Sequence, residues 1–218
     1  MTENEIGQPL PTIGVDKFYF APLIKDEPDG TIEYGESVRV PGLVHITFKP
    51  NSVSDTFYAD NGPYTSAAQT GDITVDVDQA DIPLALRAMW YGQKYEHGVL
   101  EEGQINPIEM GVGYRVKKSN GSHRNIWLHK GKAILPDEDA VTQGSSVNFQ
   151  TSKITIKCSM LVANGKYRRV VDDDSKDLAE GVNAETIEKH WFTSPLWDYT
   201  KAPDEDTGED PGGDPIED

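Results

Sequence analysis

The sequence lacks the features of a secreted or membrane-bound protein. It has one cysteine in 218 residues, Cys158, so no disulfide can form within the chain. The first residues contain no basic stretch followed by an apolar one, and no run of about 18 apolar residues occurs anywhere. We therefore expect neither a secretory leader nor a membrane-spanning helix, and we expect synthesis in the cytoplasm.

Motifs of catalysis and cofactor binding are also missing. The five histidines do not have the spacing of a zinc site, and no G-x-S-x-G, G-x-G-x-x-G or P-loop motif occurs. Carboxylate pairs of the kind that glycosidases use can be found, for example in Asp172–Asp174, but 37 acidic residues produce such pairs by chance. We expect no enzyme, no cofactor and no metal site.

Basic residues are scarce, and the acidic ones are unevenly spread. The chain has 20 lysines and arginines and a net charge of −17. Eight acidic residues and no basic ones lie in residues 202–218, so removing this segment leaves −9 on residues 1–201. A segment of proline, glycine and carboxylates cannot form a core, which predicts a disordered acidic tail over residues 201–218. An acidic chain is also poorly suited to binding nucleic acid through phosphates.

What the sequence does contain is two-residue alternation of apolar and polar side chains, the pattern of half-buried β-strands. In residues 71–79 the apolar set is Ile73, Val75 and Val77. The polar set, which we expect on the opposite face, is Asp72, Thr74, Asp76 and Asp78. Similar patterns predict strands over residues 16–23, 43–49, 108–116, 125–133, 153–161 and 167–171. The fold is therefore predicted to be mainly β.

Helices and turns follow from local signals. A helix is predicted after residue 80, with Asp81 as its cap, Pro83 in its first turn and an apolar stripe of Ile82, Leu86, Met89 and Trp90. A second short helix is predicted over residues 184–192, with Asn183 as cap. The pair Asn120-Gly121 predicts a turn, and Asn164-Gly165 predicts a hairpin that joins the last two strands. Cys158 falls on the apolar face of its strand, together with Ile154, Ile156, Met160 and Val162.

Taken in order, several segments resemble the major tail proteins of long-tailed siphophages, in particular the family named after phage phi13. The resemblance covers roughly residues 10–195 and depends on the ensemble, since each piece alone is only a strand, a turn or a capped helix. It is carried by IGVDKFYFAPL (13–23), FYADNGPYTSAAQTGDITVDVDQADIPLALRAMWYGQ (57–93), VGYRVKKSNGSHRNIWLHKGKAIL (112–135) and FQTSKITIKCSML (149–161).

The resemblance implies a tail tube subunit. Its fold would be a β-sandwich or partly closed barrel with a flanking α-helix, over residues 13–200, preceded by an N-terminal extension over residues 1–12. Hexameric rings of such subunits would stack into the hollow conduit that delivers phage DNA, in a virion tail made in the host cytoplasm. The other expected partners are a tape-measure protein, a tail terminator and distal tail proteins, and DNA would pass without specific binding.

Two candidate surfaces follow. The polar face of residues 71–79, formed by Asp72, Thr74, Asp76 and Asp78, is expected to face the tube lumen or a neighbouring subunit, or else only solvent. The polar segment 25–42, which is too long for a tight hairpin, is expected to contact the next ring. Its candidate residues are Asp26, Glu27, Asp29, Ile32, Glu33, Tyr34, Glu36 and Val38. The alternative function is a carbohydrate-binding or host-recognition β-sandwich at a tail tip.

Overall fold

The computed structural model describes residues 9–59, 62–135, 142 and 150–201, so the predicted acidic tail lies outside the described residues except for Lys201. Within these residues, eleven strands and two helices follow one another. The elements are β1 (Thr12–Asp26), β2 (Ile32–Tyr34), β3 (Val38–Val40), β4 (Leu43–Ala59), β5 (Gly62–Gln79), α2 (Leu84–Tyr91), β6 (Lys94–Glu96), β7 (Val99–Glu101), β8 (Met110–Lys118), β9 (His123–Ile134), β10 (Ser152–Ser159), β11 (Arg168–Asp172) and α3 (Ala184–His190).

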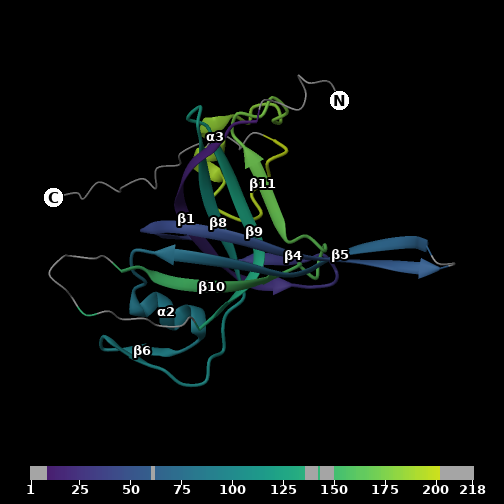
Figure 1. The fold of residues 1–218 in the computed structure, drawn as a ribbon. Coiled ribbons are helices and arrows are strands. Elements are labelled where there is room, and N and C mark those ends of the chain that lie inside the picture. The colour runs from purple at the N-terminus through teal and green to yellow at the C-terminus, as the bar shows by residue number, and fades with distance from the viewer. Residues whose placement is uncertain (1–8, 60–61, 136–141, 143–149, 202–218) are drawn as a thin grey trace, which may run out of the picture.

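Nine of the strands form one antiparallel sheet. Its main path runs β2-β1-β8-β9-β10-β5-β4, while β3 pairs with β1 and β11 pairs with β9. The strands β6 and β7 form a separate two-stranded ribbon below α2 in Figure 1. The predicted mainly β fold with a flanking helix is confirmed.

The sheet is so strongly curved that β1 and β4, which lie five steps apart along the path, contact each other. No hydrogen-bonded ladder joins these two strands among the described residues, so the sheet is not closed into a barrel. The curvature brings one face of every long strand into a single apolar cluster. That cluster includes Phe18, Phe20, Val75, Val77, Val112, Ile126, Leu128, Ile154 and Ile156, with Trp90 and Tyr91 from α2. The alternation in the sequence therefore reports a single shared core.

Among the described residues, a second apolar cluster covers the opposite face of the sheet over β1, β8, β9 and β11. There α3 and the chain after it build this cluster around Trp127, which is fully buried. The Trp127 indole Nε1 donates to the backbone carbonyl oxygen of Trp191 at 2.8 Å, and Tyr19 stacks on Phe192 at 4.7 Å between ring centroids. The predicted cap of α3 is confirmed, because the Asn183 side chain accepts from the Thr186 backbone N–H at 3.0 Å.

The predicted hairpin between the last two strands is wrong in its pairing. A turn does form at Gly165, which has φ of 68°, but β10 and β11 both pair with β9 instead of with each other. The long β9 offers its edge to β10 from Lys130 to Ile134 and to β11 from Arg124 to Leu128. The sheet thus splits at β9, and the split separates the covered half from the β10-β5-β4 half.

The start of α2 also differs from its prediction. The N-cap is Pro83, without a side-chain hydrogen bond, and Asp81 lies too far upstream to reach the free N–H groups of a helix that begins at Leu84. The predicted apolar stripe holds for Trp90, which packs edge-on against Phe20. It fails for Met89, which is half exposed because this two-turn helix turns Ala88, Trp90 and Tyr91 inward instead.

Apolar residues near strand ends depart from the alternation. Met160 and Val162 are exposed, because β10 ends at Ser159 and the chain bends there, while Leu161 is buried in their place. Val44 is exposed beside a register shift in β4. Cys158 is buried as predicted, and burial raises its pKa to about 12, since a thiolate is poorly solvated there. Its thiol is therefore inert near neutral pH.

Glycines of β8 make room for the second cluster. A Cβ added at Gly113 would lie 3.0 Å from three atoms of the Trp127 ring, which is buried and cannot retreat. We expect Gly113→Ala to lower the free energy of unfolding by about 1–3 kcal/mol, the usual cost of overpacking, as measured by urea titration. Gly14→Ala in β1 is the matched control, because nothing lies within 4 Å of its added Cβ. Equal stability of the two variants would contradict this packing.

Candidate functional site

The polar face of β5 is the first candidate surface. Antiparallel pairing places β10 and β4 on either side of β5, with Thr155 and Thr47 both opposite Asp76. The Asp76 carboxylate accepts from Lys49 Nζ at 2.6 Å and from Thr155 Oγ1 at 2.8 Å. The hydrogen bond from Lys49 lowers the pKa of Asp76 despite its partial burial. The structure therefore brings this residue into a cross-strand network, unlike Asp72, which is exposed.

The same face is not uniformly acidic. Lys153 lies opposite Asp78, and Lys157 and Lys49 both lie opposite Thr74, so three lysines share the face with Asp72, Asp76 and Asp78. His45 also approaches Asp78, with 3.4 Å between Nδ1 and Oδ2. The sequence of β5 alone predicted a row of carboxylates, but its neighbours balance that row. No helix among the described elements covers this face.

The second candidate surface, residues 25–42, is folded onto β1. The β2 strand pairs with the end of β1, and β3 pairs with Phe18–Phe20. The Tyr34 hydroxyl donates to the carbonyl oxygen of His129 at 2.7 Å, and burial raises the pKa of Tyr34. Ile32 pairs with Asp26 across the ladder. The candidates that remain exposed are Glu27, Asp29, Glu33, Glu36 and Val38.

Asp26 differs from the other candidates because its carboxylate is bound inside the protomer. It accepts from the backbone N–H groups of Val162 and Ala163, both at 2.9 Å, and from Lys130 Nζ at 2.8 Å. Its side chain is only 4% exposed. Burial alone would raise the pKa of Asp26, but these three hydrogen bonds outweigh it and hold the pKa below its usual value. Asp26 thus fixes the bend between β10 and β11, where the sheet splits.

The feature that sequence reasoning missed is the length of the β4–β5 hairpin. The two strands pair as far as Ala59 and Gly62, whereas β10 pairs with β5 only from Ile73 to Gln79. Within the part of the chain that the structure describes, residues 52–59 and 62–70 consequently pair only with each other, and the ribbon extends well beyond the body (Figure 1). The dipeptide Asn61-Gly62 was the available signal, as a strong hairpin turn sequence.

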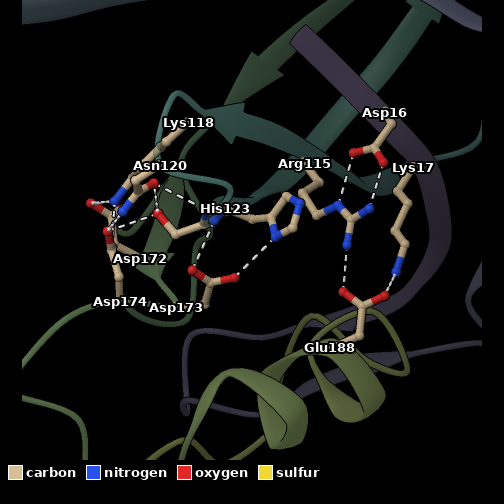
Figure 2. A network of polar contacts seen from close by, with 11 residues as sticks. Asp16, Lys17, Arg115, Lys118, Asn120, His123, Asp172, Asp173, Asp174 and Glu188 are labelled. Atoms are coloured by element: carbon tan, nitrogen blue, oxygen red, sulfur yellow. Dashed lines mark hydrogen bonds and ion pairs between the residues drawn. The ribbon is translucent and has the colours of Figure 1, made fainter. Parts of the chain in front are cut away.

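The carboxylates considered for glycosidase chemistry bind protein groups instead (Figure 2). Lys118 Nζ contacts Asp172 at 2.9 Å and Asp174 at 2.6 Å. Asp174 also accepts from Asn120 and Ser122 in the β8–β9 turn. Burial alone would raise the pKa of Asp174, but the hydrogen bonds from Lys118, Ser122 and Asn120 hold it well below its usual range. These bonds attach the β8–β9 turn to the chain that follows β11.

A neighbouring network attaches α3 to the sheet (Figure 2). Arg115 donates to both oxygens of Asp16, at 2.8 and 2.5 Å, and also pairs with Glu188 of α3. Lys17, which lies at an irregularity of β1 with φ of 56°, pairs with the same Glu188. The hydrogen bond from Arg115 lowers the pKa of Asp16. Within the described ranges, no group of three or more His, Cys, Asp or Glu residues is arranged to hold a metal ion.

Comparison with known protein families and with curated proteins found no match. Within the described residues, neither helix is long and apolar enough to cross a membrane.

Proposed function

We propose that this chain is a self-assembling structural protein, and more particularly the tail tube subunit of a long-tailed phage. The observation that carries the proposal is the β4–β5 ribbon. Eight pairs of residues join β4 and β5 beyond Ile73, the last residue of β5 that pairs with β10. A two-stranded ribbon is marginally stable alone in water, and its open edges favour pairing with another chain. A second copy of the chain is the partner that the proposal assigns to it.

A ribbon that binds a different surface of the next copy produces heterologous contacts. Contacts of this kind continue into an open filament unless a rotation closes them into a ring. A tube of stacked rings combines the two: contacts within a ring close by rotation, and contacts between rings repeat along the tube axis. The exposed residues of segment 25–42, which lie at the end of β1 and on β2 and β3, are the second surface that we assign to the contact between rings.

The uncovered face of β10-β5-β4 is the surface that we assign to the lumen. Its lysines are balanced by carboxylates, so it offers phosphates little net attraction. A conduit needs such a surface, because each unbalanced lysine or arginine would add affinity for passing DNA.

Electron microscopy of the purified protein is the experiment that tests the proposal. Stacked rings or tubes support it, and a stable monomer contradicts it. The other candidate function, a glycan-binding module, would give monomers that bind sugars through exposed aromatic rings. The structure provides few of these, because Trp90, Trp127 and Trp191, three of the four tryptophans, are at most 2% exposed.

The lumen assignment predicts an effect of charge reversal. Replacing Asp72 and Asp78 with lysine leaves the Lys49–Asp76 pair intact but makes the face strongly positive. We expect normal tails with slower DNA ejection, measured as the rate of DNA release from purified virions, because lysines hold phosphates. The combined changes Glu96→Lys and Glu101→Lys, on the exposed β6–β7 ribbon, are the control with the same change of charge and unchanged ejection. Unchanged ejection in the Asp72 and Asp78 variant would remove this face from the lumen.

A further inference from the structure

A groove of about 860 Å³ runs beside β11 on the side away from β9. Consecutive residues of β11, including Arg168 and Arg169, line it, so the groove follows the edge of the strand. Within the described residues β11 pairs only with β9, which leaves this edge open. Val170, in the middle of the strand, is 45% exposed. The groove therefore offers an extended segment both backbone groups and an apolar contact.

The groove is basic although the chain is acidic. Arg124, Lys166, Arg168 and Arg169 line it, against two carboxylates, Asp172 and Asp177. Arg169 is held in place, since it donates to the carbonyl oxygens of Pro195 and Trp197 at 2.6 and 3.1 Å and lies over the rings of Trp191 and Tyr199. A net positive groove selects an acidic ligand.

One donor at the groove has no acceptor. The indole Nε1 of Trp191, a residue that lines the groove and is only 2% exposed, has no hydrogen-bond partner among the described residues. A buried donor without an acceptor is costly. A carboxylate or carbonyl oxygen of a bound peptide would satisfy it.

The chain itself supplies a peptide of this kind. Tyr199 and Thr200 line the groove, and residues 202–218 continue directly from there with eight carboxylates and no basic residue. We propose that this acidic C-terminal segment binds along the β11 groove of its own protomer. Attachment at the groove gives it an effective concentration on the order of millimolar, so weak contacts suffice. Bound there, it covers an open strand edge that would otherwise pair with other chains.

Zero-length carbodiimide coupling tests the proposal on the intact protein. The reagent joins a lysine amine to a carboxylate in contact with it, and mass spectrometry identifies the joined peptides. We expect Lys166 to couple to residues 204–218 several-fold more often than Lys153 or Lys157, which are exposed on the β10 face. High salt should reduce this coupling. Coupling that is no more frequent at Lys166 than at those two lysines would overturn the proposal.

Two further measurements separate the alternatives. Arg124→Glu, at a groove residue with an exposed side chain, should lower the Lys166 coupling about two- to fivefold, the effect of losing one exposed ion pair, whereas Lys153→Glu should not change it. Near-UV circular dichroism checks that both variants are folded. In a mixture of ¹⁴N- and ¹⁵N-labelled protein, joined peptides should carry a single isotope. Joined peptides of mixed isotope would show binding between copies and overturn binding within the protomer. None of these readouts depends on tube formation.

Discussion

Shortening the β4–β5 ribbon is expected to abolish tube assembly and to leave the subunit folded. The variant removes residues 53–69 and joins Ser52 to Thr70, which face each other in the ladder, through a two-residue Asn-Gly turn. Among the described residues, 53–59 and 62–69 pair only with one another, and β5 keeps its core residues Ile73, Val75 and Val77. Assembly loses its contact between copies, while the fold keeps these core residues of β5.

Electron microscopy for tubes and urea titration for stability measure the two halves of this prediction separately. His97→Asn, at the tip of the β6–β7 ribbon, is the control, because asparagine tolerates the φ of 52° found there. Its tubes should be normal. Normal tubes from the shortened variant would refute the role of the β4–β5 ribbon. An unfolded variant would show that the ribbon belongs to the folding unit, contrary to what its pairing implies.

Asp26→Ala is expected to lower the free energy of unfolding by about 2–4 kcal/mol. It removes three hydrogen bonds at once, from two backbone N–H groups and from Lys130, to a carboxylate whose side chain is only 4% exposed. Glu27→Ala, at the next residue but exposed, should change stability by less than about 0.5 kcal/mol. Urea titration of both variants at neutral pH measures the difference. Equal stability of the two variants would show that the Asp26 hydrogen bonds do not stabilise the bend between β10 and β11.

The Asp26 contribution should also depend on pH with a definite sign. The folded pKa of Asp26 lies below the value of about 3.8 in the unfolded chain, so the folded protein binds fewer protons there than the unfolded chain. The stabilisation is therefore complete above that value and is lost as the pH falls through the lower folded pKa. The stability gap between wild type and Asp26→Ala should stay constant near neutral pH and narrow below about pH 4.

Much of the local structure could be predicted from the sequence. The alternation around Ile154 and Ile156 identified both a strand and its buried face, because side chains point to alternate sides of any strand. Asn183 predicted the start of α3, because its side chain accepts a hydrogen bond from the backbone N–H of Thr186, only three residues further along the chain. The Asp81 prediction failed since nothing in the local pattern showed that α2 begins only at Leu84.

Properties that depend on which strands lie side by side could not be predicted in this way. The residues opposite Asp76 and Asp78 are separated from them in the chain, so the lysines that balance them were invisible to a pattern within β5. Asp26 was grouped with exposed loop residues because its acceptor role involves Val162 and Ala163, more than 130 residues away.

The sequence by itself determined the mainly β class, the inner face of most strands, the start of α3 and the compositional break at the acidic tail, since each depends on neighbours within a few residues. Only the tertiary structure decided that β9 divides its edge between β10 and β11, that the β5 face is balanced in charge, and that the β4–β5 ribbon leaves the body. These depend on register and curvature, which are set by contacts between distant segments as the core packs.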